Sequence, residues 1–452
     1  MKIFTGIKCK IVTLFFILIL TLPVNNFAQT WQAMGTGASG TVNAMVVYNN
    51  QLIAAGFFSV AGGQLVNNIA RWNGTSWQPL GLGTNDTIFS LTIFNSFLVA
   101  GGKFTSAGGV SCNKVAFWNG TSWNTTGGIF NGNVYALVAS GTTLLAGGDF
   151  TLVNGKNTLR VAKWTNTWDT IGSGFNSTVY SLALYNNIFY AGGSFTISDG
   201  LPAYRISRYN GSSWTNAGVG LDDGIVYALR VYNNSLYVGG SFTTLGGSTT
   251  NRIARWNGTS WANVGFGFSG TVYALHSLGT NLYAGGEFDF ADFLPASKIA
   301  VYDGAAWSAL GTGISGTSPK VRSIWSYLND IVAGGTFTQA GGQNVSNIAT
   351  WKLTTGIINT GNNIPAYYNL SQNYPNPFNP STKINFSLPA GEFTSLKVFD
   401  SKGALVENVI NEIIAAGNYE VTLDLSSVPS GVYFYTLSSG SFKDTKKMIL
   451  VK

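Results

Sequence analysis

Few side chains in this sequence are suited to acid–base or metal chemistry. Residues 29–452 contain one histidine, His276, and one cysteine, Cys112. A zinc or copper site built from several histidines is therefore excluded, a Ser-His-Asp triad could use only His276, and no intramolecular disulfide is expected. We interpret His276 as a tolerated variant at an interior position, with a catalytic base as the alternative.

The acidic side chains offer one cluster. Glu287, Asp289 and Asp292 lie within six residues and could bind Ca²⁺ through carboxylate oxygens, but they lack the Asp-x-Asp-x-Asp-Gly spacing of a calcium loop. Two carboxylates that cleave a polysaccharide would have to lie on facing strands, for example at a channel mouth. We therefore predict no catalytic residue, no metal ion and no cofactor, and keep a polysaccharide-acting enzyme as an alternative.

Better candidates for ligand binding come from comparing the copies of an internal repeat. A segment of the form Val-x-Ala-Leu recurs, and its x position is occupied in turn by Asn43, Phe89, Tyr135, Tyr180, Tyr227, Tyr273 and Arg322. Positions that vary between copies are not required for the fold and can have another function. Aromatic side chains at equal depth around an axis could stack against sugar rings or a peptide, and the alternative is that they pack between neighbouring sheets.

A second position varies three residues further along the same segment. Its occupants are Val46, Thr92, Val138, Ala183, Arg230, His276 and Trp325. Arg230, His276 and Trp325 belong to consecutive copies, and we expect them to form a local polar patch together with Arg322. The predicted ligand-binding residues are therefore Tyr135, Tyr180, Tyr227, Tyr273, Arg322, Arg230, His276 and Trp325.

Tryptophan sets the period of the repeat. Trp31, Trp77, Trp123, Trp168, Trp214, Trp261 and Trp307 follow one another at intervals of 46, 46, 45, 46, 47 and 46 residues. Each unit holds four strand-length segments bounded by Gly, Asn, Ser or Thr, and no amphipathic run of helical length. This pattern predicts an all-β fold, a seven-bladed β-propeller with four-stranded blades of about 46 residues over residues 29–352.

The frame of the repeat predicts how the ring closes. The chain of repeats begins with a lone fourth strand, TWQAMG, and its last recognisable segment, NIATWK, is a third strand. We predict that residues 30–35 add as the outer strand to the sheet built from residues 320–352. In the turn W-N-G-T-S-W, Asn-Gly should supply the positive φ, and both indoles should lie on one face of the sheet and fill the gap between blades.

The repeat resembles a known family. Over residues 31–352, a glycine pair before x-Phe, then Trp or Tyr, then Trp five residues later resembles the kelch-type β-propeller. An extra glycine pair, such as Gly62-Gly63, and a shorter turn before the second Trp distinguish this chain from that family's pattern. The resemblance implies a propeller fold.

The amino terminus and the charge distribution restrict location and partners. Three lysines, an apolar run over residues 11–22 and Ala28 predict a signal peptide over residues 1–28, with a retained membrane anchor as the alternative. We expect no membrane span after its removal. Residues 31–364 hold 15 basic and 11 acidic side chains, a net charge of +4, which is too dilute to predict nucleic-acid binding.

The last part of the chain has a different composition. Residues 353–366 lack periodicity and are interpreted as a linker, and alternating strands at 383–388, 395–400, 418–425 and 432–437 predict a small Ig-like β-sandwich over residues 367–452. The stretches LSQNYPNPFNPSTKINFSLP, VFDSKGALV, GNYEVTLDLSSVPSGVYFYTL and KKMILVK resemble the type IX secretion C-terminal sorting domain. That resemblance implies an export address for an outer-membrane translocon, often cleaved while the cargo is attached to surface lipopolysaccharide. The alternative is an ordinary adhesive Ig-like module.

Together these features predict a secreted or surface-attached protein without catalytic activity that binds a glycan or a surface protein. Its second partner would be the type IX translocon, through residues 367–452. The alternatives are the polysaccharide-acting enzyme and an inert structural component of a surface layer. The enzyme is the first alternative, but it is less favoured than a binding protein because no catalytic constellation is evident in the sequence.

Overall fold

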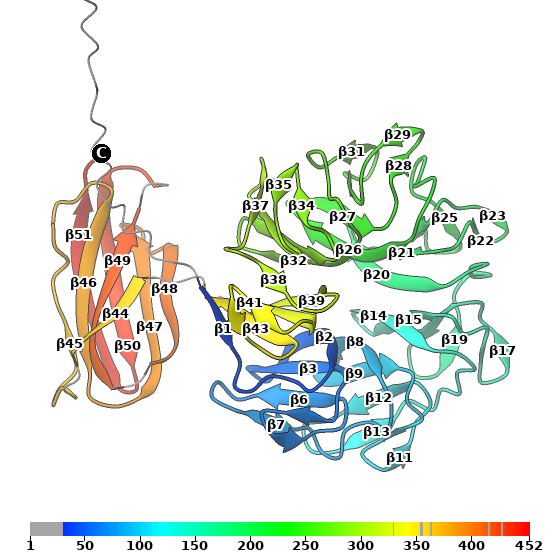
Figure 1. Ribbon diagram of the computed structural model, residues 1–452, viewed down its shortest axis with the longest axis horizontal. Coiled ribbons are helices and arrows are strands. Elements are labelled where there is room, and N and C mark those ends of the chain that lie inside the picture. Colours follow the sequence, from blue (N-terminus) through cyan, green and yellow to red (C-terminus); the bar gives the residue numbers. More distant parts are fainter. Residues whose placement is uncertain (1–29, 329, 353–355, 362–363, 415, 426–427) are drawn as a thin grey trace, which may run out of the picture.

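The protein is built from β-strands and turns. The computed structural model describes residues 30–328, 330–352, 356–361, 364–414, 416–425 and 428–452, so the predicted signal peptide lies outside the described residues. Within these ranges, no helix is long and apolar enough to cross a membrane. Figure 1 shows a disc of small sheets and a second, two-layered domain.

The described part of residues 30–352 forms seven four-stranded antiparallel sheets, here numbered 1 to 7. Sheets 1 to 3 consist of β2 (Thr41–Tyr48), β3 (Gln51–Phe57), β6 (Ile69–Trp72) and β7 (Trp77–Pro79); β8 (Ile88–Phe94), β9 (Phe97–Gly102), β12 (Val115–Trp118) and β13 (Trp123–Thr125); and β14 (Val134–Ser140), β15 (Thr143–Gly148), β18 (Val161–Trp164) and β19 (Trp168–Thr170). Sheets 4 and 5 consist of β20 (Val179–Tyr185), β21 (Ile188–Gly193), β24 (Ile206–Tyr209) and β25 (Trp214–Asn216); and β26 (Val226–Tyr232), β27 (Ser235–Gly240), β30 (Ile253–Trp256) and β31 (Trp261–Asn263). Sheets 6 and 7 consist of β32 (Val272–Leu278), β33 (Asn281–Gly286), β36 (Ile299–Tyr302) and β37 (Trp307–Ala309); and β39 (Lys320–Tyr327), β40 (Asp330–Thr336), β43 (Ile348–Lys352) and β1 (Thr30–Ala33).

The sheets are arranged in a closed ring. The first strand of each sheet contacts the first strand of the next, in the order β2, β8, β14, β20, β26, β32 and β39, and β39 contacts β2 (Figure 1). This radial order of four-stranded sheets is a β-propeller. The predicted all-β propeller fold is confirmed.

The predicted closure of the ring is also confirmed. β1 pairs antiparallel with β43, with Thr30 opposite Lys352 and Trp31 opposite Trp351. The strand from the start of the ring therefore completes the sheet formed at its end, so β43 is not left as a free edge.

The glycine pair of each repeat allows the sheets to approach closely. In sheet 4, a Cβ at Gly192 would overlap Val226 on the innermost strand of sheet 5, and a Cβ at Gly193 would overlap the carbonyl of Thr178 within its own sheet. The first glycine therefore makes room for the neighbouring sheet, and the second makes room for the backbone just before β20.

The two tryptophans of each W-N-G-T-S-W turn lie on one face of the sheet, as predicted, but only one of the two turn residues has a positive φ. Trp72 and Trp77 pair directly across β6 and β7, their ring centroids are 5.2 Å apart, and so both lie on one face. In the turn between them, Gly74 alone has a positive φ, of 102°. Asn73 instead closes the turn with its side chain, whose Oδ1 accepts hydrogen bonds from the backbone of Thr75 and Ser76.

The fourth-strand indoles also link neighbouring sheets. Trp77 Nε1 donates to the carbonyl of Met34 at 2.8 Å, and Trp214 Nε1 donates to the carbonyl of Ile171 at 2.9 Å. The corresponding bonds of the other sheets are Trp123 to Leu80, Trp261 to Ala217 and Trp31 to Leu310, with Trp168 donating to the Thr126 hydroxyl. The Trp307 Nε1 is buried and has no partner among the described residues.

Each repeat contains one more element than the sequence predicts. A hairpin of two-residue strands lies between the second and third strands, and in four of the repeats the extra glycine pair forms its turn. These strands are β4 (Val60–Ala61) and β5 (Gln64–Leu65), β10 (Ser106–Ala107) and β11 (Val110–Ser111), β16 (Leu152–Val153) and β17 (Lys156–Asn157), β22 (Ile197–Ser198) and β23 (Leu201–Pro202), β28 (Thr244–Leu245) and β29 (Ser248–Thr249), β34 (Phe290–Ala291) and β35 (Leu294–Pro295), and β41 (Gln339–Ala340) and β42 (Gln343–Asn344), which β38 (Ile314–Ser315) joins. Strands this short leave no periodic pattern in the sequence.

The second domain consists of two four-stranded antiparallel sheets that share one hydrophobic core. One has the order β44 (Gly356–Gly361), β49 (Gly417–Asp424), β46 (Ser381–Leu388) and β45 (Asn369–Leu370), and the other has the order β48 (Leu405–Ile414), β47 (Glu392–Asp400), β50 (Gly431–Ser439) and β51 (Phe442–Leu450). The prediction that residues 353–366 form only a linker is wrong, because β44 pairs with β49 over residues 356–361. This strand was missed because its two isoleucines are flanked by the Gly, Asn and Thr typical of loops.

Candidate functional site

The varied aromatic residues occupy one structural position, a β-bulge in the innermost strand of each sheet. In β26, Val226 pairs with Gly240 and Ala228 pairs with Gly239, so Tyr227 has no partner across the ladder. The same break in register occurs at the equivalent residues Asn43, Phe89, Tyr135, Tyr180, Tyr273 and Arg322. A bulge turns its extra side chain out of the regular ladder, and here all seven lie around the axis of the ring.

Five of these residues form a continuous row of rings, which we call the aromatic arc. It consists of Phe89, Tyr135, Tyr180, Tyr227 and Tyr273. Successive ring centroids are 4.8, 5.3, 5.3 and 5.1 Å apart. Each of the five residues is half-buried, so the arc is not closed off from solvent.

Polar residues close the circle between the ends of the arc. The guanidinium carbon of Arg322 lies 5.4 Å from the centroid of the Tyr273 ring, and Lys320 Nζ lies 5.8 Å from the same ring. On the other side, Asn43 Nδ2 donates to the carbonyl of Ile88, next to Phe89, at 3.1 Å. The mouth of the axis is therefore aromatic on one side and hydrogen-bonding on the other.

Two carboxylates lie beside the arc, and sequence analysis did not connect them with it. Glu287 forms an ion pair with Lys320 at 2.7 Å, and Asp149 Oδ2 accepts a hydrogen bond from the Tyr135 hydroxyl at 3.1 Å. Both occupy the x position of Gly-Gly-x-Phe, which follows the bulge-facing glycine. That position also varies between copies, and this variation was the signal that could have identified them.

Burial affects the protonation states of the tyrosines and of Glu287 at the mouth. It raises the pKa of Tyr135, Tyr227 and Tyr273, so their hydroxyls stay neutral and can both donate and accept. Desolvation opposes ionisation of Glu287 as well, but hydrogen bonds from Lys320 and its neighbours outweigh it and hold the pKa of this carboxyl below its ordinary value. Glu287 is therefore a carboxylate at neutral pH.

Arg230, His276 and Trp325 converge in a second group, which we call the interior cluster. Arg230 lies over the Trp325 ring at 5.8 Å, the rings of His276 and Trp325 are 4.9 Å apart, and His276 Nε2 is 3.0 Å from the Ser326 hydroxyl. These side chains come from β26, β32 and β39, on three consecutive sheets.

The expected patch that joined Arg322 to this cluster does not form among the described contacts. Arg322 is a bulge residue that contacts Tyr273, whereas the cluster lies three positions further along the strands. At roughly 3.3 Å per residue, that separation is about 10 Å. The eight predicted residues therefore divide into a mouth group and an interior group.

The other reactive side chains are engaged elsewhere. Glu287 pairs with Lys320, Asp289 pairs with Lys298, and Asp292 accepts backbone hydrogen bonds from Phe266 and Gly267, so these acids do not converge. Among the described residues, no group of three or more potential metal ligands is found. Burial raises the pKa of the Cys112 thiol to about 11, which leaves little thiolate for nucleophilic chemistry.

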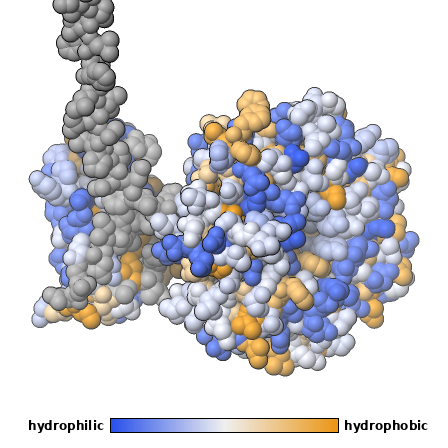
Figure 2. Space-filling model, viewed as in Figure 1, coloured by the Kyte–Doolittle hydropathy of each residue, from blue (hydrophilic) through white to orange (hydrophobic). Residues whose placement is uncertain are grey.

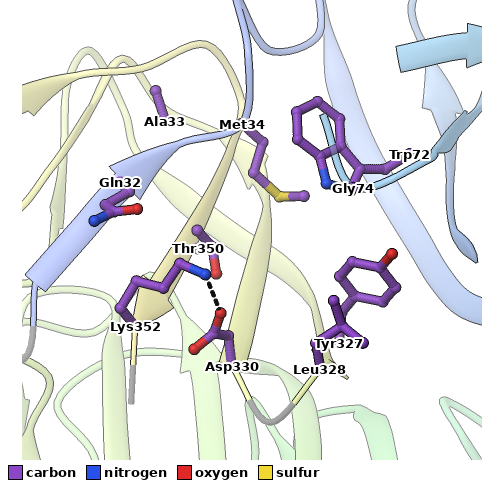
Figure 3. A pocket seen from close by; sticks show the side chains of 10 residues that line it. All are labelled: Gln32, Ala33, Met34, Trp72, Gly74, Tyr327, Leu328, Asp330, Thr350 and Lys352. Carbon is purple, nitrogen blue, oxygen red and sulfur yellow. Dashed lines mark hydrogen bonds and ion pairs between the residues drawn. The ribbon is translucent and has the colours of Figure 1, made fainter. Parts of the chain in front are cut away.

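A cavity of about 200 Å³ lies at the seam where the ring closes (Figure 3). The Trp72 and Tyr327 rings line one side, and Lys352 lies 2.6 Å from Asp330 on the other. Thr350 also lines it, at a position where the other sheets carry Arg71, Phe117, Lys163, Arg208, Arg255 and Val301.

An apolar surface lies at the tip of the sheet 6 hairpin. Phe266 and Phe293 are 68% and 75% exposed, their rings are 5.1 Å apart, and with Phe290 they line a cavity of about 440 Å³. Figure 2 shows this region as an apolar patch over β34 and β35. Exposed aromatic clusters of this kind are typical of interaction surfaces.

Comparison with known families identifies both parts of the chain. Residues 65–231 match the Rax2 C-terminal beta propeller domain, and residues 233–258 match a beta-propeller domain of unknown function. Residues 372–452 match the secretion system C-terminal sorting domain. The kelch-type assignment stays a prediction.

Two solved structures are similar in outline. One is PorZ, a bacterial surface component of the type IX secretion system of Porphyromonas gingivalis, at 13% identity and a TM-score of 0.30, covering 91% of this chain and 76% of PorZ. The other is a fungal alcohol oxidase of the AA5 family in complex with copper, at 10% identity and a TM-score of 0.42, covering 94% of this chain and all of the oxidase. A search of curated proteins finds no match. The chain thus combines a β-propeller with a type IX C-terminal sorting domain, which directs it to export and to a secreted or cell-surface location.

Proposed function

We propose that the exported propeller binds a glycan at the mouth of its axis, without catalysis. The aromatic arc carries this proposal. Half-exposed rings in a continuous row offer stacking surfaces for successive sugar rings, and neutral phenol hydroxyls at their edges offer hydrogen bonds. Arg322 and the Lys320–Glu287 pair would orient the polar edge of the ligand.

The carboxylates beside the arc favour binding over hydrolysis. Glycoside cleavage needs one carboxyl group that is protonated at the working pH and positioned to donate to the leaving oxygen. Glu287 is held ionised by Lys320, and Asp149 is engaged by the Asn133 and Tyr135 side chains. An enzyme acting on polysaccharide would therefore need a different acid.

A glycan array probed with the purified chain lacking residues 1–28 tests the proposal. Retained glycan without release of sugar is expected, and Tyr180→Ala or Tyr227→Ala should weaken binding about tenfold, because each removes one stacking surface. Tyr367→Ala is the matched control, since this tyrosine is 82% exposed in the other domain. Equal binding by all variants, or release of reducing sugar, would contradict the proposal. Absence of any glycan or protein ligand would favour the surface-layer role.

A protein partner is the second candidate, and the apolar hairpin tip favours it. Phe266 and Phe293 expose apolar area that a partner could cover at the rim, away from the arc. The variant Phe293→Ser should then lose a surface protein captured by cross-linking while leaving glycan binding unchanged. If the Phe293→Ser variant captures the same protein equally well, the hairpin tip is not the contact surface.

A further inference from the structure

The interior cluster contains a cation that the protein itself does not neutralise. Arg230 donates from Nε to the Ser277 hydroxyl at 3.0 Å and from Nη2 to the Ser277 carbonyl at 3.5 Å. Both acceptors are uncharged, and no carboxylate among the described residues forms an ion pair with this guanidinium within 4 Å. Desolvation lowers the pKa of Arg230, and no neighbouring negative charge raises it again. The cost of burying this positive charge is therefore not offset by an ion pair.

A second unsatisfied group lies in the same cluster. His276 is 2% exposed, and its Nδ1 has no hydrogen-bond partner among the described residues. The Ser326 hydroxyl lies 3.0 Å from Nε2. In the tautomer in which this hydroxyl donates to Nε2, the ring proton lies on Nδ1 as a free donor, and this is the tautomer that a bound anion would select. Buried donors without partners are rare, and a bound ligand is one reason for them.

The surroundings favour an anion over a cation or a neutral ligand. Arg230 and His276 project from neighbouring strands, and both contact the Trp325 ring. The same position in sheets 1 to 4 carries Val46, Thr92, Val138 and Ala183, so the side chains with ring or guanidinium nitrogen atoms at this position are confined to sheets 5 to 7. Arg230 and Trp325 are half-buried, so solvent reaches the cluster.

We infer that the interior cluster binds one oxyanion, a carboxylate, sulfate or phosphate group, between the Arg230 guanidinium and the His276 ring. The oxygen atoms would accept hydrogen bonds from the unused guanidinium N–H groups and from Nδ1–H, and the Trp325 ring would form the floor of the site. This site is separate from the proposed glycan site at the mouth, so either can fail without the other.

Calorimetric titration of the chain lacking residues 1–28 tests the inference with sodium sulfate, phosphate, acetate and glucuronate, against chloride at matched ionic strength. We expect at least one oxyanion to bind with a stoichiometry of one and to raise the unfolding temperature, while chloride does neither. If only glucuronate does so, the oxyanion arrives as part of a sugar acid. If sulfate or phosphate suffices, the free ion is a ligand.

Variants locate the bound ion. Arg230→Gln should abolish oxyanion binding, and His276→Gln should weaken it about tenfold by loss of one donor. Arg230→Lys keeps the charge but loses the planar fork, and covers the case in which Arg230→Gln does not fold. Arg255→Gln is the matched control, because this exposed arginine lies on β30, outside both the interior cluster and the mouth, and the variant should bind normally. The inference is overturned if no oxyanion binds more tightly than chloride, or if both Arg230→Lys and His276→Gln bind it as tightly as the unmodified chain.

Discussion

At the scale of single residues, burial decides what the polar side chains can do. His276 is the only histidine of the chain, and the fold keeps it neutral. Desolvation, and then the charge of Arg230, lower its pKa to about 3 from the ordinary value of 6.5. It is therefore unsuited to act as a general base that cycles near neutral pH.

This burial predicts a pH dependence of stability. Below pH 6.5 this histidine takes up a proton in the unfolded chain, whereas in the folded chain it stays neutral until about pH 3. The stabilisation that comes from keeping His276 neutral is therefore fully present above pH 6.5 and is lost as the pH falls. The propeller should lose about 1.5 kcal/mol of unfolding free energy between pH 6.5 and 5 through this residue. All 13 tryptophans lie in residues 31–351, so tryptophan fluorescence in a urea titration reports on the propeller alone.

The control for this experiment is His276→Gln. The unfolding free energy of this variant should change less with pH over the same interval, because the glutamine side chain does not titrate. A profile as steep as that of the unmodified chain would show that other groups cause the loss.

The indole hydrogen bonds between sheets predict a difference between two matched tryptophans. Trp214 and Trp307 are both buried and each pairs with a tyrosine on the third strand, but only Trp214 Nε1 has an acceptor. Trp214→Phe should therefore destabilise the propeller about 1 kcal/mol more than Trp307→Phe, because it leaves the Ile171 carbonyl without its donor. Equal losses in urea titrations would mean that these bonds contribute nothing between sheets.

Sequence comparison could identify the candidate residues but only part of their arrangement. The shared Val-x-Ala-Leu frame placed Tyr135 to Tyr273 at one depth, because equivalent positions in a ring must be level. It could not show that x is a bulge, or that Arg230, His276 and Trp325 contact one another while Arg322 contacts Tyr273. Those facts depend on the ladder register and on contacts between sheets that have no local sequence signal.

At the scale of elements, the glycine pair and the bulge act together. The bulge turns the x side chain toward the axis, and the paired glycine makes room for the displaced backbone. The four longer strands of each repeat were predictable from tryptophan spacing and turn residues. The two-residue hairpins and β44 were not, because such short or loop-like segments form strands only through tertiary pairing.

Close packing at the first glycine predicts a specific loss and a specific rescue. Gly192→Ala should destabilise the propeller by about 1–3 kcal/mol, since the added methyl group overlaps Val226 on the next sheet. Val226→Ala in the same chain should recover part of that loss, and a double-mutant cycle followed by tryptophan fluorescence measures the coupling. Additive losses would contradict direct contact between these two positions.

At the scale of the whole molecule, stability depends on closing the ring. β1 supplies the outer strand of sheet 7, and Trp31 is buried against Trp351 with its Nε1 bonded to Leu310. This closure was predictable, because the repeat frame starts with a fourth strand and ends with a third.

A chain that begins at residue 36 should therefore be less stable by about 3 kcal/mol or more, because it loses a buried indole and exposes the edge of β43. Trp31→Phe keeps the strand and should lose less. An unchanged midpoint of tryptophan fluorescence in urea for the shortened chain would show that the ring is stable without this closure.

The most direct test of the account is a crystal structure of the protein with the oligosaccharide that the array selects. We expect sugar rings stacked on Tyr180 and Tyr227 at the mouth of the axis, with polar contacts to Arg322. Sugar bound only in the seam cavity beside Trp72 or at the rim, with the aromatic arc empty, would contradict it.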